Sequence, residues 1–388
     1  MLEVRGCGVQ TYCAGGVMSK ERLRLGVLGA GAWTVASHLP NLVQRKEEVD
    51  LVSVCRRDPV QAEAIRARFG FDFATTDFQE VFDAGVDVCI VAGPVAVHHE
   101  HAKAALEAGA HVLCEKPFTL RSGEAWELVE LANRRERHLV LAYGWHYFPM
   151  VEAARSWMQT IGVGQIEQVS VNMSSTTREA LRGQQLAFSD REDSDSGDVD
   201  LSNTDPLYVP RPETGADPAV AGGGYAQAQL SHALGLLFWL TELRCTDVFA
   251  WMATPPDSRV EFHDALCLRF ENDAIGTVSG GSNHLGSNQN KHKLDIRIIG
   301  SEGQFHIDLE RELAWIYRPG ELDEQFPVSP GDGAYNCDGP IHTLIDLALG
   351  KDVTNQSPGE VGARTVEVIE GAYRSAEAGL PVSVSSLP

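Results

Sequence analysis

Hydrophobic and polar residues in the first third of the chain follow the pattern of strands that alternate with helices. The first apolar run leads through a glycine turn into residues 32–45, which carry apolar side chains at helical spacing. Such alternation is typical of an α/β fold whose parallel sheet is covered by helices on both faces. We therefore predict a doubly wound Rossmann domain over residues 18–144. The strands are expected at 23–28, 49–55, 86–92, 110–114 and 139–142, and the later helices at 59–69, 99–108 and 123–135.

The pattern changes after residue 144, where strands follow one another without helices between them. Runs of this kind favour an antiparallel sheet. We therefore predict that residues 145–388 form a second domain, a mostly antiparallel open sheet that binds the substrate. Its strands are expected at 166–173, 246–252, 265–270, 275–280, 294–299 and 304–309. Helices are expected at 150–160, 340–349 and 360–378, the last two returning to the Rossmann sheet.

Two segments are predicted to lack regular structure. Residues 1–17 have no apolar signal-peptide core and end just before Met18, so they are interpreted as a disordered tail or a misplaced start. Residues 174–220 are polar and contain an acidic run at 190–200. Its acids do not fall at the EF-hand positions, so we interpret the segment as a solvated loop. A lid over the substrate cleft and a docking patch for a partner are the alternatives.

Composition narrows the expected partners and compartment. The 388-residue chain has a formal net charge of −22, which would repel nucleic acids and anionic membranes. The longest strongly apolar run, residues 234–240, is too short to cross a bilayer, for which about 20 residues are needed. The eight cysteines form no CxxC pair, and several, such as Cys89 and Cys114, fall in predicted buried strands. This usage favours a reducing cytoplasm.

The turn after the first strand has the glycine pattern of a dinucleotide site. Gly29 can make the tight turn, and Gly31 lets the backbone approach a pyrophosphate. The helix then starts with Ala32 and Trp33, whose unpaired amides can bind that anion. The third fingerprint position is Thr34 instead of glycine or alanine, so the motif depends on its strand and helix context.

The end of the second strand bears on the choice between NAD and NADP. NAD-specific Rossmann domains usually carry an acid there, but this chain has Arg56 and Arg57. Asp58 precedes a proline and is better explained as a helix N-cap. Arginines can pair with the 2′-phosphate of NADP, which gives NADP a slight advantage. Arg56 could instead stack on adenine or be solvated.

Three histidines and a glutamate, residues 98–101, follow the strand expected at 86–92. Their spacing matches no helical zinc motif, so we predict no metal site. Ligands of open α/β folds bind at the carboxyl ends of the strands. We therefore expect this loop, with Pro94 and His98, to lie against the cofactor or substrate.

The next strand ends at Glu115, Lys116 and Pro117. The proline biases the lysine towards an extended backbone, which gives its ammonium group a defined direction into the cleft. A desolvated lysine beside a nicotinamide can exchange a proton with the reacting hydroxyl. An exposed loop lysine is the alternative.

These motifs resemble those of the Gfo/Idh/MocA oxidoreductase family. The most specific part is the run that ends in Glu115, Lys116 and Pro117, supported by the glycine turn, by Pro94 with His98, and by residues 372–381. The resemblance spans residues 18–382. It implies an NAD(P)-binding Rossmann domain with Glu115 and Lys116 at the cofactor, followed by an open sheet that backs the substrate cleft. It also implies a homo-oligomer formed through that sheet.

A glycine-rich turn leads into a predicted helix that carries Tyr225, Gln229 and His232 at positions i, i+4 and i+7, hence on one face. By resemblance, His232 matches the family histidine that pairs with the lysine. Many members carry an aspartate where this chain has Ala228. Without that carboxylate His232 should be less basic, so Lys116 is assigned as the principal proton donor or acceptor. His232 would hydrogen-bond the substrate hydroxyl, and Gln229 or Tyr225 would orient it.

The resemblance also indicates a substrate class. Family members mostly act on sugars, cyclitols and their derivatives. His146 stands where many members have an arginine and is expected at the substrate. Residues 174–179, 222–232 and 357–364 are similar to a bacterial sub-branch that acts on glycosides, some of whose members oxidise the C3 hydroxyl of a glucosyl unit. An NAD-dependent glycosidase, a non-catalytic sugar or cofactor sensor and a partner-docking scaffold remain as alternatives.

Overall fold

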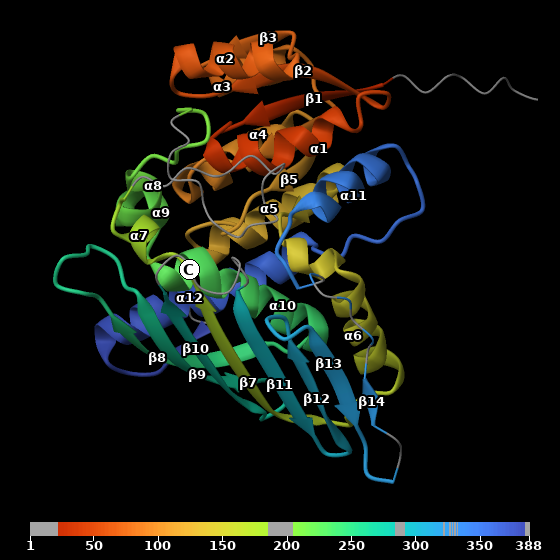
Figure 1. Cartoon of the computed structure of the whole chain (residues 1–388), viewed down its shortest axis with the longest axis vertical. Coiled ribbons are helices and arrows are strands. Elements are labelled where there is room, and N and C mark those ends of the chain that lie inside the picture. The colour runs from red at the N-terminus through yellow and green to blue at the C-terminus, as the bar shows by residue number, and fades with distance from the viewer. Residues whose placement is uncertain are drawn as a thin grey trace, which may run out of the picture.

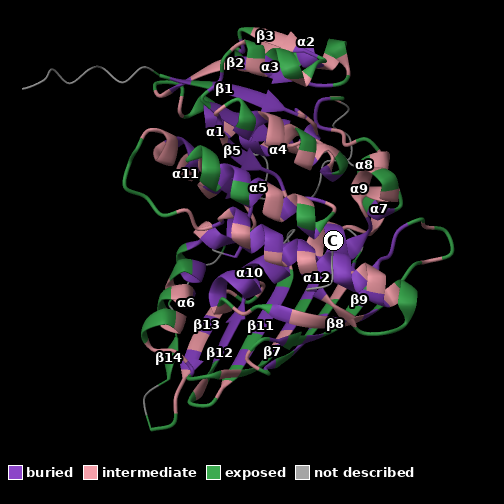
Figure 2. Ribbon diagram, turned by 180° about the vertical axis from the view of Figure 1, so that it is seen from behind, coloured by how far each residue is buried: buried purple, intermediate pink, exposed green. Residues whose placement is uncertain are grey.

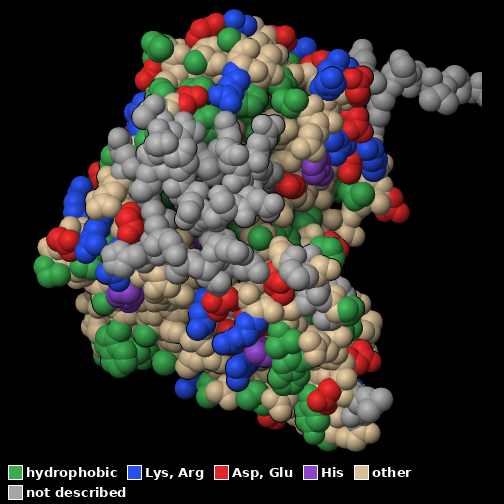
Figure 3. Space-filling model, viewed as in Figure 1, with side chains coloured by type: hydrophobic (Ala, Val, Ile, Leu, Met, Phe, Trp, Pro, Cys, Tyr) green, Lys and Arg blue, Asp and Glu red, His purple; other side chains and the backbone are tan. Residues whose placement is uncertain are grey.

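The computed structural model describes residues 22–184, 205–283, 292–320, 323–325, 327, 329, 331 and 333–384. The predicted tail at 1–17 and the acidic run at 190–200 lie outside them. Two sheets follow one another along the long axis of the molecule, with helices between them (Figure 1). Acidic and basic side chains are interspersed over the face shown in Figure 3.

The first sheet is fully parallel, with the strand order β3-β2-β1-β4-β5-β6. Its strand order reverses between β1 and β4, which is where dinucleotide-binding sheets place their ligand. The strands are β1 (Leu23–Leu28), β2 (Val49–Cys55), β3 (Phe73–Thr75), β4 (Val88–Val91), β5 (His111–Cys114) and β6 (Leu139–Leu141). The Rossmann prediction is confirmed.

Helices cover both faces of this sheet, as expected for a sheet of apolar parallel strands. The helix predicted after β1 starts at residue 32 as expected, and it contains a π-helical turn, η1 (Thr34–His38), before α1 (Leu39–Val43). The other helices are α2 (Pro59–Phe69), α3 (Phe78–Asp83), α4 (His98–Glu107), α5 (Ser122–Arg135) and, from the C-terminal part, α11 (Asp338–Ala348). Short 3-10 turns, η2 (Val95–Val97) and η3 (Gly144–Tyr147), follow β4 and β6.

The second sheet has nine strands in the order β14-β13-β12-β11-β7-β10-β9-β8-β15. Only the β7–β10 pair is parallel, so the prediction of a mostly antiparallel sheet is confirmed. The strands are β7 (Ile166–Ser175), β8 (Cys245–Ala253), β9 (His263–Phe270), β10 (Ile275–Ser282), β11 (Lys293–Gly300), β12 (Gly303–Asp308), β13 (Leu313–Tyr317), β14 (Glu324–Gln325) and β15 (Val382–Ser383).

One face of the second sheet packs against helices, and these helices join it to the first sheet (Figures 1 and 2). They are α6 (Pro149–Thr160), α10 (Ser231–Thr241) and α12 (Gly359–Ala378). α12 contacts α5 and β6 on one side and β8 and α10 on the other. One apolar cluster runs from Val112 of the first sheet to Val171 of the second. This shared core fixes the position of α10 relative to the end of β5.

The described ends of the polar segment 174–220 contain three single-turn helices, α7 (Arg178–Leu181), α8 (Glu213–Ala216) and α9 (Pro218–Ala221). The helix predicted from Tyr225 begins with a second π-helical turn, η5 (Ala226–Leu230), which leads into α10. No helix in the described ranges combines the length and the apolar character that crossing a bilayer would require.

Candidate active site

The glycine turn after β1 is packed against the loop after β4. Gly29 has a φ of +84°, and a Cβ there would lie 2.3 Å from the backbone nitrogen of Gly93. Beside Gly31 the space is open, since the nearest described atom to a Cβ would be the Gly29 oxygen at 3.9 Å. The following helix presents its first amides, which have no intrahelical acceptor. These features fit the close approach of a pyrophosphate.

Thr34 explains why the third fingerprint position needs no glycine. Its hydroxyl donates a hydrogen bond to the carbonyl of Gly29 over 3.1 Å, and its side chain is buried. The threonine side chain therefore stabilises the turn from its buried side.

Glu115 connects the start of this helix to the end of β5. One carboxylate oxygen lies 2.7 Å from Nε2 of His38 and accepts from Trp33 Nε1 over 2.8 Å, and the other accepts from the Lys116 amide. Burial alone would raise the pKa of Glu115, but the bond with His38, the charge of Lys116 and the bond from Trp33 outweigh it and lower the pKa. An ionised carboxylate is thus held behind Lys116.

The three residues that follow β2 differ in their exposure and in the groups they contact. Arg56 is buried and donates to the carbonyl of Ala30 in the glycine turn over 2.8 Å. Arg57 is exposed, and its nearest carboxylate is Glu213 at 3.8 Å. Asp58 accepts from two backbone amides at the start of α2, as predicted for a helix N-cap. Of the two arginines, Arg57 is therefore the one whose guanidinium group faces solvent.

The histidines after β4 have different environments and do not contact a common group. His98 is buried with Nε2 2.7 Å from the carbonyl of Gly93 and Nδ1 2.8 Å from that of Pro117, so both ring nitrogens face backbone and connect the two loops. Pro94 precedes η2 in the same loop. His99 pairs with Glu127, and His101 lies against Phe78 with their ring centroids 4.7 Å apart.

Two other groups of side chains have metal-ligand chemistry within the described ranges. They are His38, Glu115 and Cys337 at the end of β5, and Asp295, His306 and Asp308 on β11 and β12. In both groups the carboxylates already accept hydrogen bonds from neighbouring protein atoms. Both groups are therefore accounted for by internal hydrogen bonding.

Lys116 reaches from the end of β5 to the turn that precedes α10. Its Nζ donates to the carbonyl of Ala228 over 3.2 Å, and its peptide bond to Pro117 is cis. Burial lowers the pKa of Lys116, opposed by the negative charge of Glu115. The backbone carbonyl of Ala228 thus accepts a hydrogen bond from the ammonium group.

His232, in the first turn of α10, lies in the same site as Lys116. It is 6% exposed, and its ring lies against the rings of Trp145 and Tyr335 at centroid distances of 5.3 and 5.1 Å. Burial lowers the pKa of His232 well below its usual value, and the charge of Lys116 lowers it further. The structure thus brings together the lysine and the histidine that the sequence singled out.

The other predicted substrate contacts are arranged differently from the expected helical face. The hydroxyl of Tyr225 accepts from Ser175 of β7 over 3.1 Å, and the ring packs against Gly280. Gln229 keeps a buried Oε1 that has no partner among the described residues. The π-helical turn η5 explains the difference, because it alters the angle between positions that an α-helix would align.

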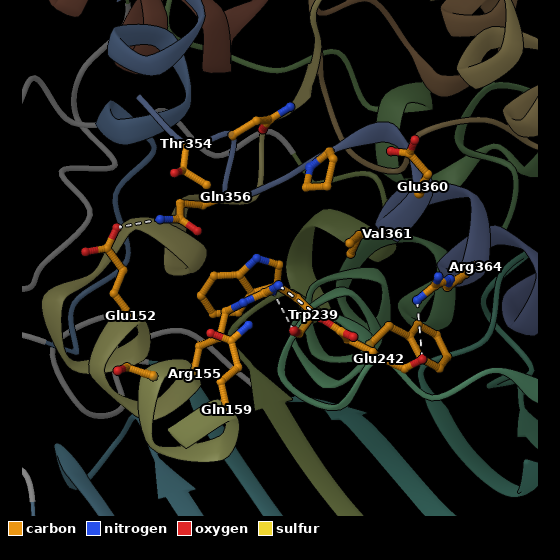
Figure 4. Close-up of a pocket in the computed structure, with 14 residues that line it drawn as sticks. Glu152, Arg155, Gln159, Trp239, Glu242, Thr354, Gln356, Glu360, Val361 and Arg364 are labelled. Atoms are coloured by element: carbon orange, nitrogen blue, oxygen red, sulfur yellow. Dashed lines mark hydrogen bonds and ion pairs between the residues drawn. The ribbon is translucent and has the colours of Figure 1, made fainter. Parts of the chain in front are cut away.

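His146 is a packed residue. Its ring is stacked between those of Tyr143 and Trp239 at 5.1 and 5.0 Å, and its Nδ1 lies 2.9 Å from the carbonyl of Gln356. Burial lowers its pKa to about 3. Behind Trp239 lies a separate cavity of about 610 Å³, whose lining includes Arg155 and Arg364 but neither Lys116 nor His232 (Figure 4).

Sequence reasoning missed several residues of the site. Trp145, His292 and Tyr335 form a cluster of rings beside His232, with centroid distances of 5.1 to 6.0 Å among the three. The charge of Lys116 also lowers the pKa of His292. The three residues come from η3, from the residue before β11 and from the segment before α11, and no local pattern relates them.

Comparisons with known proteins agree with this architecture. Residues 23–143 match the model of an oxidoreductase family with an NAD-binding Rossmann fold, and residues 196–306 match that of the GFO/IDH/MocA C-terminal domain. An uncharacterized oxidoreductase of Bacillus subtilis, YfiI, is 23% identical over 76% of this chain and 77% of its own length. The D-glucoside 3-dehydrogenase of Escherichia coli is 34% identical over 34% of this chain and 36% of its own length.

The similarity extends to solved structures. Levoglucosan dehydrogenase in complex with NADH and levoglucosan has a TM-score of 0.72 at 18% identity, covering 94% of this chain and all of that one. GenD2 from gentamicin A biosynthesis, in complex with NAD, has a TM-score of 0.70 at 23% identity, covering 96% and 99%. At sequence identities of 18% and 23%, the similarity to these two structures shows a common fold. Because both domain models match in chain order, the chain belongs to the Gfo/Idh/MocA family of NAD-binding oxidoreductases.

Proposed function

We propose that the protein is an NAD(P)-dependent dehydrogenase that interconverts a secondary hydroxyl and a ketone on a sugar, cyclitol or glycoside. One observation carries the proposal: the Lys116 ammonium group, at the end of β5, and the His232 imidazole, on α10, share one buried site. The name of the similar D-glucoside 3-dehydrogenase supports a glycoside substrate and, more specifically, the C3 hydroxyl of a glucosyl unit.

Lys116 is the proposed proton acceptor in the oxidation. Burial lowers its pKa, which favours the neutral amine that the step requires. The hydroxyl proton moves to Nζ while the carbon loses a hydride and becomes a ketone. When bound, the nicotinamide supplies the hydride acceptor. Ala228 and Glu115 hold the ammonium group that forms, one through its carbonyl and the other through its charge.

His232 is the proposed hydrogen-bond partner of the reacting hydroxyl. Its lowered pKa keeps the imidazole neutral near pH 7, so it can orient the hydroxyl without a second positive charge beside Lys116. Gln229, whose buried Oε1 has no partner within the described ranges, is better placed than Tyr225 to help orient it. His146 supports the site from behind through Tyr143.

The cofactor would be held by the first sheet. Gly29, Gly31 and the amides of Ala32 and Trp33 would bind the pyrophosphate. Pro94 and His98 would position the adjoining loop. Arg57 and Arg211 both lie within 4.0 Å of Glu213, and two neighbouring guanidinium groups would pair with a 2′-phosphate, which supports the use of NADP besides NAD.

A cofactor-reduction screen tests the proposal. Sugars, cyclitols and glycosides are incubated with the protein and with NAD⁺ or NADP⁺ in parallel, and nicotinamide absorbance is followed. We expect at least one sugar, cyclitol or glycoside to reduce the cofactor. Release of an aglycone without net reduction would instead establish the glycosidase alternative, and binding without either reaction would establish a sensor.

The open face of the second sheet supports the proposal of a homo-oligomer. Trp251 and Ile275 project from that face and are 70% and 57% exposed. Light scattering of the purified protein should give a dimer or tetramer mass.

A cytoplasmic location is supported by the free thiols of the described cysteines, which include Cys55 and Cys245. Fractionation of cells that express the protein tests it.

A further inference from the structure

Two buried polar atoms beside the reacting groups lack hydrogen-bond partners. They are Nε1 of Trp145 and Nδ1 of His292, both shielded from solvent and unpaired within the described part of the chain. Their rings lie 5.5 Å apart at an interplanar angle of 84°. Folded proteins rarely leave buried polar atoms unpaired, because the lost hydration is not replaced. Two unpaired buried atoms beside the reacting groups are therefore evidence for a ligand that supplies the missing bonds.

Both atoms belong to the site of Lys116 and His232. The ring of Trp145 lies 5.3 Å from that of His232, and the rings of Trp145 and His292 both contact Tyr335. The charge of Lys116 acts on His292 as well as on His232. A substrate held between Lys116 and His232 would therefore reach Trp145 and His292 with a neighbouring atom.

The two atoms have complementary hydrogen-bonding character. The indole Nε1–H of Trp145 can only donate. Burial and the charge of Lys116 lower the pKa of His292 to about 4, so its ring is neutral at pH 7. With the ring proton on Nε2, the tautomer that the proposal assigns, Nδ1 is the acceptor nitrogen. A hydroxyl accepts from one side and donates to the other. A carboxylate would place a lone pair against the acceptor, and an ammonium group would place a proton against the indole N–H.

We propose that Trp145 and His292 bind a second substrate hydroxyl, on a carbon next to the one that is oxidised. His292 is thus a specificity-determining residue, and the substrate class is a vicinal diol such as a pyranoside with a free neighbouring hydroxyl. This inference rests on the proposed function of Lys116 and His232.

The test uses His292→Leu and His292→Asn with the best glycoside of the screen and with its two analogues deoxygenated next to the oxidised carbon. Leucine removes the acceptor, whereas the asparagine amide can place an oxygen near the former Nδ1. His292→Leu should lower kcat/KM by about 10- to 100-fold on the parent glycoside, the effect of one buried hydrogen bond. With one deoxy analogue the variant and the wild type should be nearly equal. His292→Asn should recover most of the loss, and NADH binding should not change.

His111→Leu is the matched control, because burial and the charges of His138 and Arg137 lower the pKa of His111 to about 4 as well, at the far end of β5. It should leave kcat/KM unchanged. If His292→Leu fails to fold, Trp145→Phe removes the donor instead and must show the same dependence on the deoxy analogue. An unchanged kcat/KM, or equal losses on parent and deoxy substrates, overturns the inference. If the wild type oxidises no sugar, cyclitol or glycoside in the screen, the proposed function itself fails, and that result is seen before any variant is made.

Discussion

The two sheets of the molecule differ in how they are covered. All four residues of β4 in the parallel sheet are buried, whereas β9 in the second sheet alternates buried and exposed positions along its eight residues. A sheet covered on both faces can present functional groups only at its strand ends, as Gly29 and Lys116 show. The second sheet leaves one face open and contributes to the site through α10 and the segment before β11.

This difference shows how the chemistry is divided. The parallel sheet provides the glycine turn and the ionised Glu115 behind Lys116. The second region provides neutral imidazoles, because burial lowers the pKa of His232 and His292. A working site therefore requires both regions, and variants in each should fail in different ways.

The largest effect is expected from the parallel sheet, with Lys116→Met. Removing the proton acceptor should slow hydride transfer about 10²- to 10⁴-fold, while NADH binding is retained. Stopped-flow absorbance measures the rate of hydride transfer, and fluorescence titration measures NADH binding. Lys103→Met is the control, because Lys103 pairs with Glu127 on the surface of α4. Near-normal transfer by Lys116→Met would remove the assignment.

A smaller effect is expected from the second region, with His232→Phe, which should slow hydride transfer about 10- to 100-fold by removing one hydrogen bond.

The pH dependence of the oxidation rate should be the same in His232→Phe as in the wild type. Oxidation should accelerate as pH rises, because it needs neutral Lys116, and the rise should be complete below the usual lysine pKa, since burial lowers that pKa. Rate profiles from pH 6 to 10 check this. Loss of the alkaline rise in His232→Phe would assign the base role to the histidine.

The buried carboxylate of Asp264 has no hydrogen-bond partner within the described ranges, in contrast to the carboxylate of Glu115. The stability of the second region should therefore depend on pH through Asp264. Burial and the charge of Glu261 raise the pKa of Asp264 from 3.8 to about 8. The folded state therefore favours the protonated acid, and stability should fall as pH rises from 3.8 to 8, by at most about 1.4 kcal/mol per pH unit. Asp264→Asn should raise Tm at pH 8 and make little difference near pH 4. A difference that does not vary with pH would contradict the burial argument.

The smallest effect is expected at the tip of β2. Arg57→Ala should raise KM for NADP⁺ about two- to five-fold, the size typical of an exposed ion pair, and leave KM for NAD⁺ unchanged. Arg68→Ala, at the other end of α2, is the control. Equal shifts for both cofactors would show that Arg57 does not contact the 2′-phosphate.

The fold could be predicted wherever local signals agreed. β2 and α2 have the expected bounds, because a continuous apolar run is followed by Asp58 as a cap and a proline at the first helical position. β3 and α3 were not predicted, since three and six residues are too few to show a period. The strand β13 was also missed, in a segment assigned to no element.

The site was predictable only where a single segment carries it. Gly29 and Lys116 lie in local motifs that follow strands, and His232 follows from the resemblance of its segment to the family pattern. The face shared with Tyr225 was not predictable, because the π-helical turn η5 leaves no mark in the hydrophobic pattern. His292 and Tyr335 were missed because only tertiary folding brings their segments to Lys116.

A double-mutant cycle on Lys116→Met and His232→Phe tests the central claim most directly, with single-turnover hydride transfer from the best glycoside as the measured rate. If the ammonium group and the imidazole act on one hydroxyl, the double variant should be about as slow as Lys116→Met alone. If the two losses instead multiply, the groups act independently and a shared site is contradicted.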